Sequence, residues 1–232
     1  MLLALVPPAR IAAISHYSQD PGATSIPLDV AQRFRTTTGT AEEVIALKPD
    51  LVVASSFTAP ATRAAFARAG LKTLYLDSPT TIAASKVQIA ELAAAVGAQA
   101  KGAALNARID AAVAAAHPGA ARPAALLFIG GDLASGGGNL LDELLTTAGF
   151  RNAAADYGLS FTGTLPVETI VSRPPGVILA PDFGGRTAVL RRRILGASVP
   201  ELPFARSLIN CGGPTIPAAL ARLAAIHKRV VR

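Results

Sequence analysis

A repeating order of short apolar runs and helical segments constrains this chain more than any other feature of its sequence. In the first third, the apolar runs are 11–15, 51–54 and 73–76, and the helical patterns between them are 40–47 and 59–69. Such alternation predicts a parallel sheet covered by helices. The run 51–54 contains no polar residue, which is the pattern of a strand buried on both faces. Residues 16–39, rich in Ser, Thr, Pro and Gly, are predicted to form a long loop.

This order breaks between residues 80 and 116, where nearly every position favours helix and no strand candidate occurs. Gly97 and Gly102 are the expected interruptions. A helix over 98–116 would be about 28 Å long, the span of a small lobe. The order then resumes with predicted strands at 124–129, 177–180 and 207–210 and predicted helices at 140–148, 186–195 and 215–231. We therefore expect an N-terminal lobe (1–79), a helical segment that includes the inter-lobe helix (80–119) and a C-terminal lobe (120–232).

An internal repeat supports two similar lobes. Residues 42–54 can be laid over 168–180, which places Glu42 on Glu168 and Pro49 on Pro175. Each copy reads as a short helix, a turn marked by proline and an apolar strand. Repetition of one such unit on both sides of a helical segment is typical of two related lobes. The first copy also opens with the spacing of a capping box, from Thr40 to Glu43.

Composition excludes several classes of protein. The net charge of +7 invites a nucleic-acid interpretation, but the only dense basic run, 191–193, has no flanking aromatic residue or glycine and predicts a solvated helix face. No apolar run is long enough to span a bilayer. The single cysteine, Cys211, allows no disulfide within the chain, and its spacing from histidines indicates no metal site. No cofactor and no nucleic-acid partner are expected.

Three segments resemble one family. Residues 40–52 (TAEEVIALKPDLV) resemble a segment of the periplasmic binding proteins for vitamin B12, haem and ferric siderophores, which are the solute-binding components of ABC importers. Residues 13–21 are similar to the cobalamin-binding members, and 137–149 with the following Asn152 resembles the helix of their second lobe. The resemblance implies two Rossmann-like lobes with parallel sheets joined by one long α-helix. It also implies a periplasmic, monomeric protein that holds its ligand between the lobes and delivers it to a membrane permease.

The resemblance differs at the start of the chain. Family members open with an export signal, then a strand, a ligand-lining loop and a helix, whereas here residues 2–5 read as the last turn of that helix, stopped by Pro7 and Pro8. We therefore expect an N-terminally truncated chain whose first lobe lacks its first strand.

Candidate ligand contacts follow from the rule that α/β sheets bind ligands beyond the carboxyl ends of their strands. The residues at these positions are His16, Tyr17, Ser55, Ser56, Phe57, Asp132, Ser135, Asp182, Phe183 and Asn210. The aromatic members offer faces for a large planar or corrinoid ligand, and the others offer polar contacts to its periphery. Each could instead be an ordinary loop residue. An axial role for His16 on cobalt or iron competes with a plain surface position.

The glycine-rich segment 130–139 follows a strand and precedes a helix, but it lacks the spacing of a phosphate-binding loop, so we expect a flexible loop of the ligand cleft. Glu42 and Glu168 match the family's carboxylates that meet arginines of the permease; alternatively, they complement helix dipoles. Two other functions remain open: a cytosolic nucleotide-binding α/β enzyme, or a truncated remnant that no longer binds. No nucleophile elbow or acid–base pair supports an enzyme.

Overall fold

The computed structural model describes residues 1–116, 119–181, 185–196, 198–209 and 212–231. The predicted contacts Asp182, Phe183 and Asn210, together with Cys211, lie outside these ranges. The chain divides into two compact units: unit 1 comprises Met1–Pro79 and Ala83–Asn106, and unit 2 comprises Thr80–Ile82 and Ala107–Arg232. Each is an α/β structure with parallel strand pairs, which confirms the predicted fold class.

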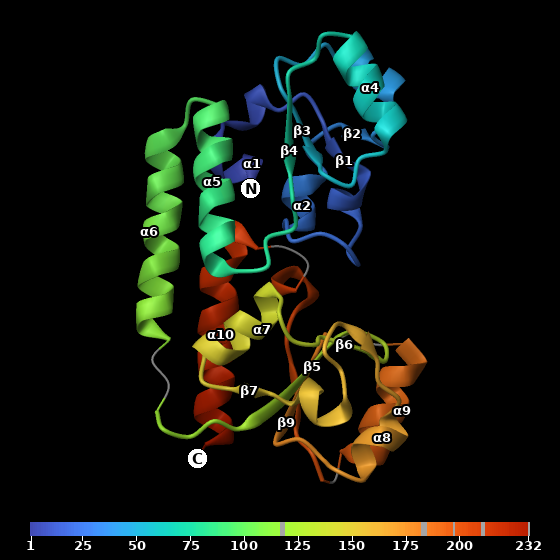
Figure 1. The fold of residues 1–232 in the computed structure, drawn as a ribbon, viewed down its shortest axis with the longest axis vertical. Helices are drawn as coiled ribbons and strands as arrows, with labels where there is room; N and C mark the ends of the chain where they lie inside the picture. The colour runs from blue at the N-terminus through green and yellow to red at the C-terminus, as the bar shows by residue number, and fades with distance from the viewer. Residues whose placement is uncertain (117–118, 182–184, 197, 210–211, 232) are drawn as a thin grey trace. The chain divides into compact units, whose positions relative to one another are not determined.

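Unit 1 contains two separate two-stranded parallel sheets (Figure 1). The first pairs β1 (Ile14–Ser15) with β2 (Thr36–Thr37), and the second pairs β3 (Val52–Ser55) with β4 (Thr73–Leu76). The accompanying helices are α1 (Leu2–Leu5), α2 (Leu28–Ala31), α3 (Ala41–Ala46), α4 (Pro60–Arg68), most of α5 (Ile82–Ala95) and the 3₁₀ turns η1 (Pro8–Arg10) and η2 (His16–Gln19).

Two expectations for unit 1 are wrong. The segment 51–54 is not buried on both faces, because the side chains of β3 are half-buried or exposed. The segment 16–39 is not a plain loop, because it contains α2 and β2. Its strand β2 was hard to predict since it consists of two threonines in a polar stretch, and its pairing with β1 is a tertiary contact rather than a local preference.

The start of α3 joins this helix to β2. The Thr40 hydroxyl accepts a hydrogen bond from the Glu43 amide at 3.3 Å, as the capping box predicts. The Glu43 carboxylate, however, does not return to Thr40: it accepts from the hydroxyls of Thr37 (2.7 Å) and Thr38 (2.8 Å) and from the Thr38 amide (2.8 Å). These donors hold the pKa of Glu43 below its ordinary value. The helix is thereby tied to the end of the neighbouring strand.

Helices α5 and α6 (Gln99–Ala115) form an antiparallel pair, seen side by side in Figure 1. Gly97, with φ of 69°, ends α5 as expected. Gly102 is not an interruption: it lies inside α6, where a Cβ atom would come within 2.5 Å of the Ala93 side chain, so the glycine permits close helix packing. The division between the two units falls within α6, between Asn106 and Ala107.

Unit 2 contains a six-stranded sheet in the order β10-β9-β5-β6-β8, with β7 paired to β5. The parallel strands are β5 (Ala124–Gly130), β7 (Arg151–Asn152), β9 (Val177–Ala180) and β10 (Glu201–Pro203); β6 (Leu133–Ala134) and β8 (Gly163–Thr164) are antiparallel. The helices are α7 (Leu140–Thr147), α8 (Val167–Val171), α9 (Gly185–Leu195), α10 (Ile216–Val230) and the 3₁₀ turns η3 (Ala153–Tyr157), η4 (Arg206–Leu208) and η5 (Gly213–Thr215).

The core of unit 2 lies on the two central strands. Leu126 and Phe128 of β5 and Ile178 of β9 are buried together with Ile170 of α8. The Asn139 side chain caps α7 by accepting from the Asp142 amide at 3.1 Å. The strand predicted at 207–210 is wrong, because residues 206–208 form η4 and the edge strand is β10. Because β10 begins with a glutamate and ends with a proline, it lacks the apolar pattern from which strands are predicted.

The basic run 191–193 is not a wholly solvated face. Arg191 is only 3% exposed, donates to both carboxylate oxygens of Glu201 (2.9 and 3.2 Å) and to the Gly131 carbonyl (2.7 Å), and stacks 4.0 Å over the Phe128 ring. This one side chain therefore links α9, β10 and the turn after β5. Among the described helices, none has the length and apolar character needed to cross a membrane.

Candidate functional site

The carboxyl ends of β1 and β2 in unit 1 present an exposed histidine–tyrosine pair. His16 and Tyr17 open η2 directly after β1, and their rings lie 4.1 Å apart. The His16 Nδ1 atom is 3.4 Å from the Thr37 carbonyl oxygen at the end of β2, which fixes the imidazole across the strand pair. Tyr17 is 61% exposed, so its ring face is open to a ligand.

The carboxyl end of β3 forms a tight turn around Ser55. The Ser55 hydroxyl accepts from the Phe57 amide at 3.1 Å, and the Ser55 carbonyl accepts from the Thr58 amide at 2.9 Å. This turn projects Phe57, whose side chain is 81% exposed. Ser55 therefore stabilises the turn, and the turn exposes the side chain of Phe57.

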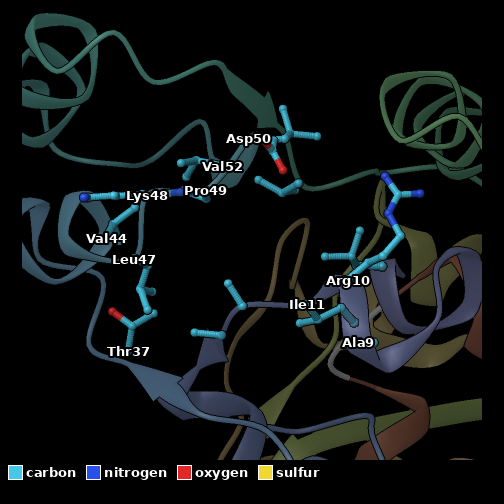
Figure 2. Close-up of a pocket in the computed structure, with 15 residues that line it drawn as sticks. Ala9, Arg10, Ile11, Thr37, Val44, Leu47, Lys48, Pro49, Asp50 and Val52 are labelled. Carbon is cyan, nitrogen blue, oxygen red and sulfur yellow. The ribbon is translucent and has the colours of Figure 1, made fainter.

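A groove of about 490 Å³ lies elsewhere in unit 1 (Figure 2). Its two long walls are residues 9–13, which lead into β1, and residues 49–53, which lead into β3. Leu2, Thr37, Val44, Leu47 and Lys48 complete the lining. None of the predicted contact residues that the structure describes lines this groove, since they follow the strands and the groove lies beside them.

In unit 2, Asp132 sits in the turn between β5 and β6. It lines a small pocket of about 140 Å³ that also includes Glu168, Thr187 and the buried Arg191. Asp132 and Glu168, predicted as a ligand contact and a docking residue, are therefore brought to one place. Ser135 is fully buried, and its hydroxyl is within 3.4 Å of both Asn139 amide-group atoms, which favours a structural role.

The glycine-rich segment, expected to be flexible, is tied down by asparagines. Asn152 donates to the Gly136 carbonyl (3.1 Å) and to Asp142 (2.9 Å), and Asn139 donates to the same carbonyl (3.2 Å). A Cβ atom on Gly136 would lie 2.2 Å from the Phe161 carbonyl oxygen, so only glycine fits there. The segment is a packed support for the neighbouring turn rather than a mobile loop.

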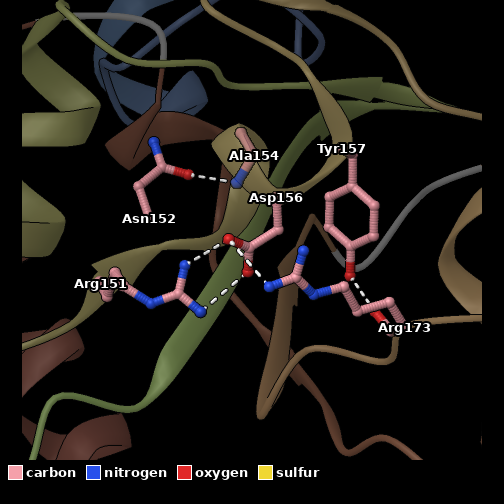
Figure 3. A network of polar contacts seen from close by, with 6 residues as sticks. All are labelled: Arg151, Asn152, Ala154, Asp156, Tyr157 and Arg173. Atoms are coloured by element: carbon pink, nitrogen blue, oxygen red, sulfur yellow. Dashed lines mark hydrogen bonds and ion pairs between the residues drawn. The ribbon is translucent and has the colours of Figure 1, made fainter.

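A polar network anchors the other side of Asn152 (Figure 3). Arg151 makes two 2.8 Å hydrogen bonds to Asp156, and Arg173 approaches the same carboxylate at 3.8 Å. The Tyr157 hydroxyl donates to the Arg173 carbonyl at 2.6 Å. The hydrogen bonds from Arg151 hold the pKa of Asp156 below its ordinary value, whereas burial raises the pKa of Tyr157. The network fixes η3, whose first turn Asn152 caps.

Two candidate contacts in unit 2 were missed by the sequence analysis. Phe161, 80% exposed, is carried by the backbone that packs on Gly136. Arg206 opens η4 just after β10, and its guanidinium nitrogen lies 3.1 Å from where a Cβ atom on Gly130 would be. An aromatic in a polar loop was a usable signal for Phe161. Arg206 was hidden because the strand before it was predicted in the wrong place.

The two predicted docking carboxylates occupy matching positions. Glu42 is the second residue of α3 and Glu168 is the second residue of α8, and each helix leads through a proline turn into a parallel strand. Both side chains are exposed, and neither has a hydrogen-bond or ion-pair partner within the described part of the chain. Glu43, by contrast, accepts hydrogen bonds from Thr37 and Thr38. This arrangement leaves one free carboxylate at the start of each repeated element.

Exposed aromatic and polar side chains at the carboxyl ends of parallel strands define an α/β protein of the ligand-binding class. Within the described ranges, no group of three or more His, Cys, Asp or Glu side chains is placed to hold a metal ion. A family model described as "Periplasmic binding protein" matches residues 1–188. The chain belongs to the periplasmic binding protein family. A search of curated protein sequences finds no match.

Solved structures share this fold. The periplasmic haem-binding protein RhuT from Roseiflexus sp. RS-1 is 23% identical with a TM-score of 0.81, covering 100% of this chain and 94% of RhuT. The haem-binding HutB of Vibrio cholerae is 16% identical (TM-score 0.78; 97% and 93% covered). The vitamin B12-binding BtuF of Vibrio cholerae is 17% identical (TM-score 0.71; 95% and 89% covered). At these identities the likeness establishes the fold alone.

Proposed function

We propose that this protein is the solute-binding component of an ABC importer and that it captures a cobalamin-like ligand or an iron chelate, either haem or a ferric siderophore. The observation that carries the proposal is the match to the periplasmic binding protein family over residues 1–188. The bound solute passes to a membrane permease. We further propose that the protein acts as a monomer in the periplasm and performs no catalysis.

The strand-end loops supply chemistry suited to such ligands. Tyr17 and Phe57 in unit 1 and Phe161 in unit 2 offer exposed ring faces of the kind on which a porphyrin or corrinoid stacks. Asp132 and Arg206 offer polar contacts to the periphery of a ligand, and the guanidinium of Arg206 suits a carboxylate or propionate group. The prediction that the loops of the two units close on one ligand, with α6 as the connecting helix, stays a prediction.

Titration with haemin, cyanocobalamin and a ferric hydroxamate siderophore tests the proposal. We expect saturable binding of one of them. Binding is monitored by the change in tyrosine fluorescence and, for haemin, also by the shift of the Soret band. Tyr17→Ala and Phe57→Ala should each weaken it about tenfold, since a stacked aromatic contributes on the order of 1 kcal/mol beyond its area. Val87→Ala removes an exposed apolar side chain from α5 and serves as the control. Failure of all three ligands to bind would contradict the proposal.

The docking carboxylates are tested separately from ligand binding. Glu42→Arg and Glu168→Arg should slow association with the cognate permease in nanodiscs and weaken its salt dependence, because exposed charges mainly guide encounter. Glu91→Arg reverses an exposed charge on α5 and is the matched control. Equal association rates for all three variants would remove Glu42 and Glu168 from the interface.

A further inference from the structure

Helix α9 exposes aliphatic side chains on the face that is turned away from the core of unit 2. The helix packs on the core through a buried stripe that includes Ala188 and Leu195. Val189, Leu190 and Ile194 are instead between 43% and 59% exposed. The outer face of a surface helix is usually polar, so three aliphatic side chains grouped on it indicate an interaction surface.

Two arginines complete this surface. Arg186 and Arg193 are exposed, and neither has a hydrogen-bond or ion-pair partner in the described part of the chain. Helix positions that are three, four, seven and eight residues apart share one face, and the exposed positions 186, 189, 190, 193 and 194 have this spacing. These five residues therefore form one surface, which we call the α9 face.

The charge of the α9 face is positive. The sequence of α9 contains four arginines and no acidic residue. Arg191 is buried against Glu201, and Arg192 approaches the same carboxylate at 3.4 Å, so these two charges are compensated within the chain. The charges of Arg186 and Arg193 are not compensated in this way, and they are available to an anionic partner.

Two acidic side chains border one side of the α9 face. Asp132 and Glu168 line the small pocket to which Leu190 also belongs, on the side where α9 packs beside α8 (Figure 1). Arg186 and Arg193 do not line this pocket. The two arginines therefore lie on the part of the face that is directed away from these carboxylates.

Free arginines interleaved with aliphatic side chains suit an anionic bilayer surface. A nucleic acid or an acidic peptide would satisfy Arg186 and Arg193 but would offer little apolar surface to Val189 and Ile194. A layer of anionic headgroups satisfies both kinds of residue, because arginines contact the phosphates while aliphatic side chains enter the boundary with the acyl chains. The long apolar stem of arginine also allows its charged end to stay among the headgroups.

We propose that the α9 face is a docking surface for an anionic phospholipid bilayer, on which α9 lies parallel to the membrane plane. Arg186 and Arg193 pair with lipid phosphates, and Val189, Leu190 and Ile194 contact the acyl boundary. The contact is reversible, because two arginines and three partly inserted side chains contribute far less than a membrane-spanning helix. It requires neither a bound solute nor a permease and therefore does not rest on the proposed transport function.

Cosedimentation of the intact chain with lipid vesicles tests the proposal. We expect binding to vesicles of phosphatidylglycerol mixed with phosphatidylcholine, no binding to pure phosphatidylcholine, and release at about 1 M salt, where the screening length falls to about 3 Å. Equal binding to the two kinds of vesicle, or binding to neither, would overturn the proposal.

Charge reversals locate the contact on α9. The double variant Arg186→Glu with Arg193→Glu should weaken vesicle binding at least about 25-fold, because each arginine near an anionic surface contributes about fivefold. Lys101→Glu with Arg108→Glu changes the net charge by the same amount at exposed positions of α6 and is the matched control, with an expected loss of less than about threefold. An equal loss in the two double variants would show a general effect of net charge and would overturn the proposal.

A fluorescent side chain tests whether the aliphatic residues enter the bilayer, even if the charge variants fail to fold. The chain contains no tryptophan, so Val189→Trp introduces a single indole, and Val87→Trp places one at a similarly exposed position on α5 as the control. On addition of the phosphatidylglycerol vesicles, we expect a blue shift of the emission from position 189 and none from position 87. No shift at position 189, or a response to heparin but not to vesicles, would overturn the proposal. Haemin and cyanocobalamin titrations contain no lipid, so the two proposals fail separately.

Discussion

Arg191 shows how one buried charge can position a neighbouring turn. Its guanidinium is enclosed by Glu201, the Gly131 carbonyl and the Phe128 ring, all within 4.0 Å. Burial of an unpaired charge is costly, so loss of either Arg191 or Glu201 would leave the other charge poorly compensated. Because Gly131 precedes Asp132, the same contacts set the position of the Asp132 turn.

Arg191→Ala should lower the free energy of unfolding by about 3 kcal/mol, because Glu201 then remains buried beside only the longer 3.4 Å contact to Arg192. Denaturant unfolding measures this change. Arg193→Ala removes a solvent-exposed arginine from the same helix and should change stability by less than about 0.5 kcal/mol. Equal effects of the two substitutions would refute the role given to Arg191.

Asp156 gives a prediction about pH. Its pKa is lower in the folded chain than the ordinary 3.8, mainly because Arg151 donates two hydrogen bonds to it. Stabilisation by this carboxylate is therefore complete above the unfolded value and is lost as pH falls below about 4. Asp156→Asn should cost up to about 1 kcal/mol at pH 7, since Arg151 is half-exposed, and the difference from wild type should shrink toward pH 3.

Chemical denaturation of both proteins across this pH range measures the effect. Asp29→Asn is the control, because the Asp29–Arg33 pair is 74% exposed on both sides and 3.8 Å long. A stability difference at position 156 that does not vary with pH would show that the carboxylate contributes through packing and not through its charge.

At the scale of the element, the α5–α6 pair depends on the absence of one methyl group. Gly102→Ala places a Cβ atom 2.5 Å from the Ala93 side chain, so the helices must separate. We expect a loss of about 1–3 kcal/mol, even though alanine is the better helix former by about 1 kcal/mol. The double variant Gly102→Ala with Ala93→Gly should recover part of that loss, and simple additivity in this cycle would count against the contact.

Local signals predicted most of the long elements. The helices from 140, 186 and 215 and the strands at 73–76 and 177–180 appear within one or two residues of their expected bounds, because each combines periodicity with a cap or a glycine. The strands β2, β6, β7 and β8 are two residues long, and β10 has three. Their existence depends on pairing with distant strands, which no local pattern encodes.

Residues of the candidate site were predicted correctly where the end of the preceding strand was predicted correctly. Tyr17 and Phe57 lie exposed after β1 and β3, where the strands were expected to end. Ser135 was chosen by the same rule but points inward to Asn139. Arg206 was missed because β10 was placed six or seven residues too late along the chain. The burial of Ser135 and the position of the edge strand before Arg206 depend on tertiary packing, which the local sequence does not encode.

At the scale of the whole chain, α6 is shared by both units. Ala107 is exposed at the division, so Ala107→Pro removes no packing but breaks the helix, at a cost of about 3 kcal/mol or more. We expect rapid proteolytic cleavage near this position. Ala100→Pro, in the first turn of α6 where proline is tolerated, should resist cleavage like the wild type. Equal resistance of both variants would contradict a continuous helix across the division.

The two adjacent glutamates of α3 differ in whether they make contacts within the chain. Glu43 links α3 to β2 through hydrogen bonds from Thr37 and Thr38, whereas Glu42 beside it has no hydrogen-bond or ion-pair partner in the described part of the chain. Residue 42, and likewise Glu168, can therefore change without the loss of a contact within the described part of the chain. If the proposed docking role is correct, these two positions are the ones at which the chain could be adapted to a different permease.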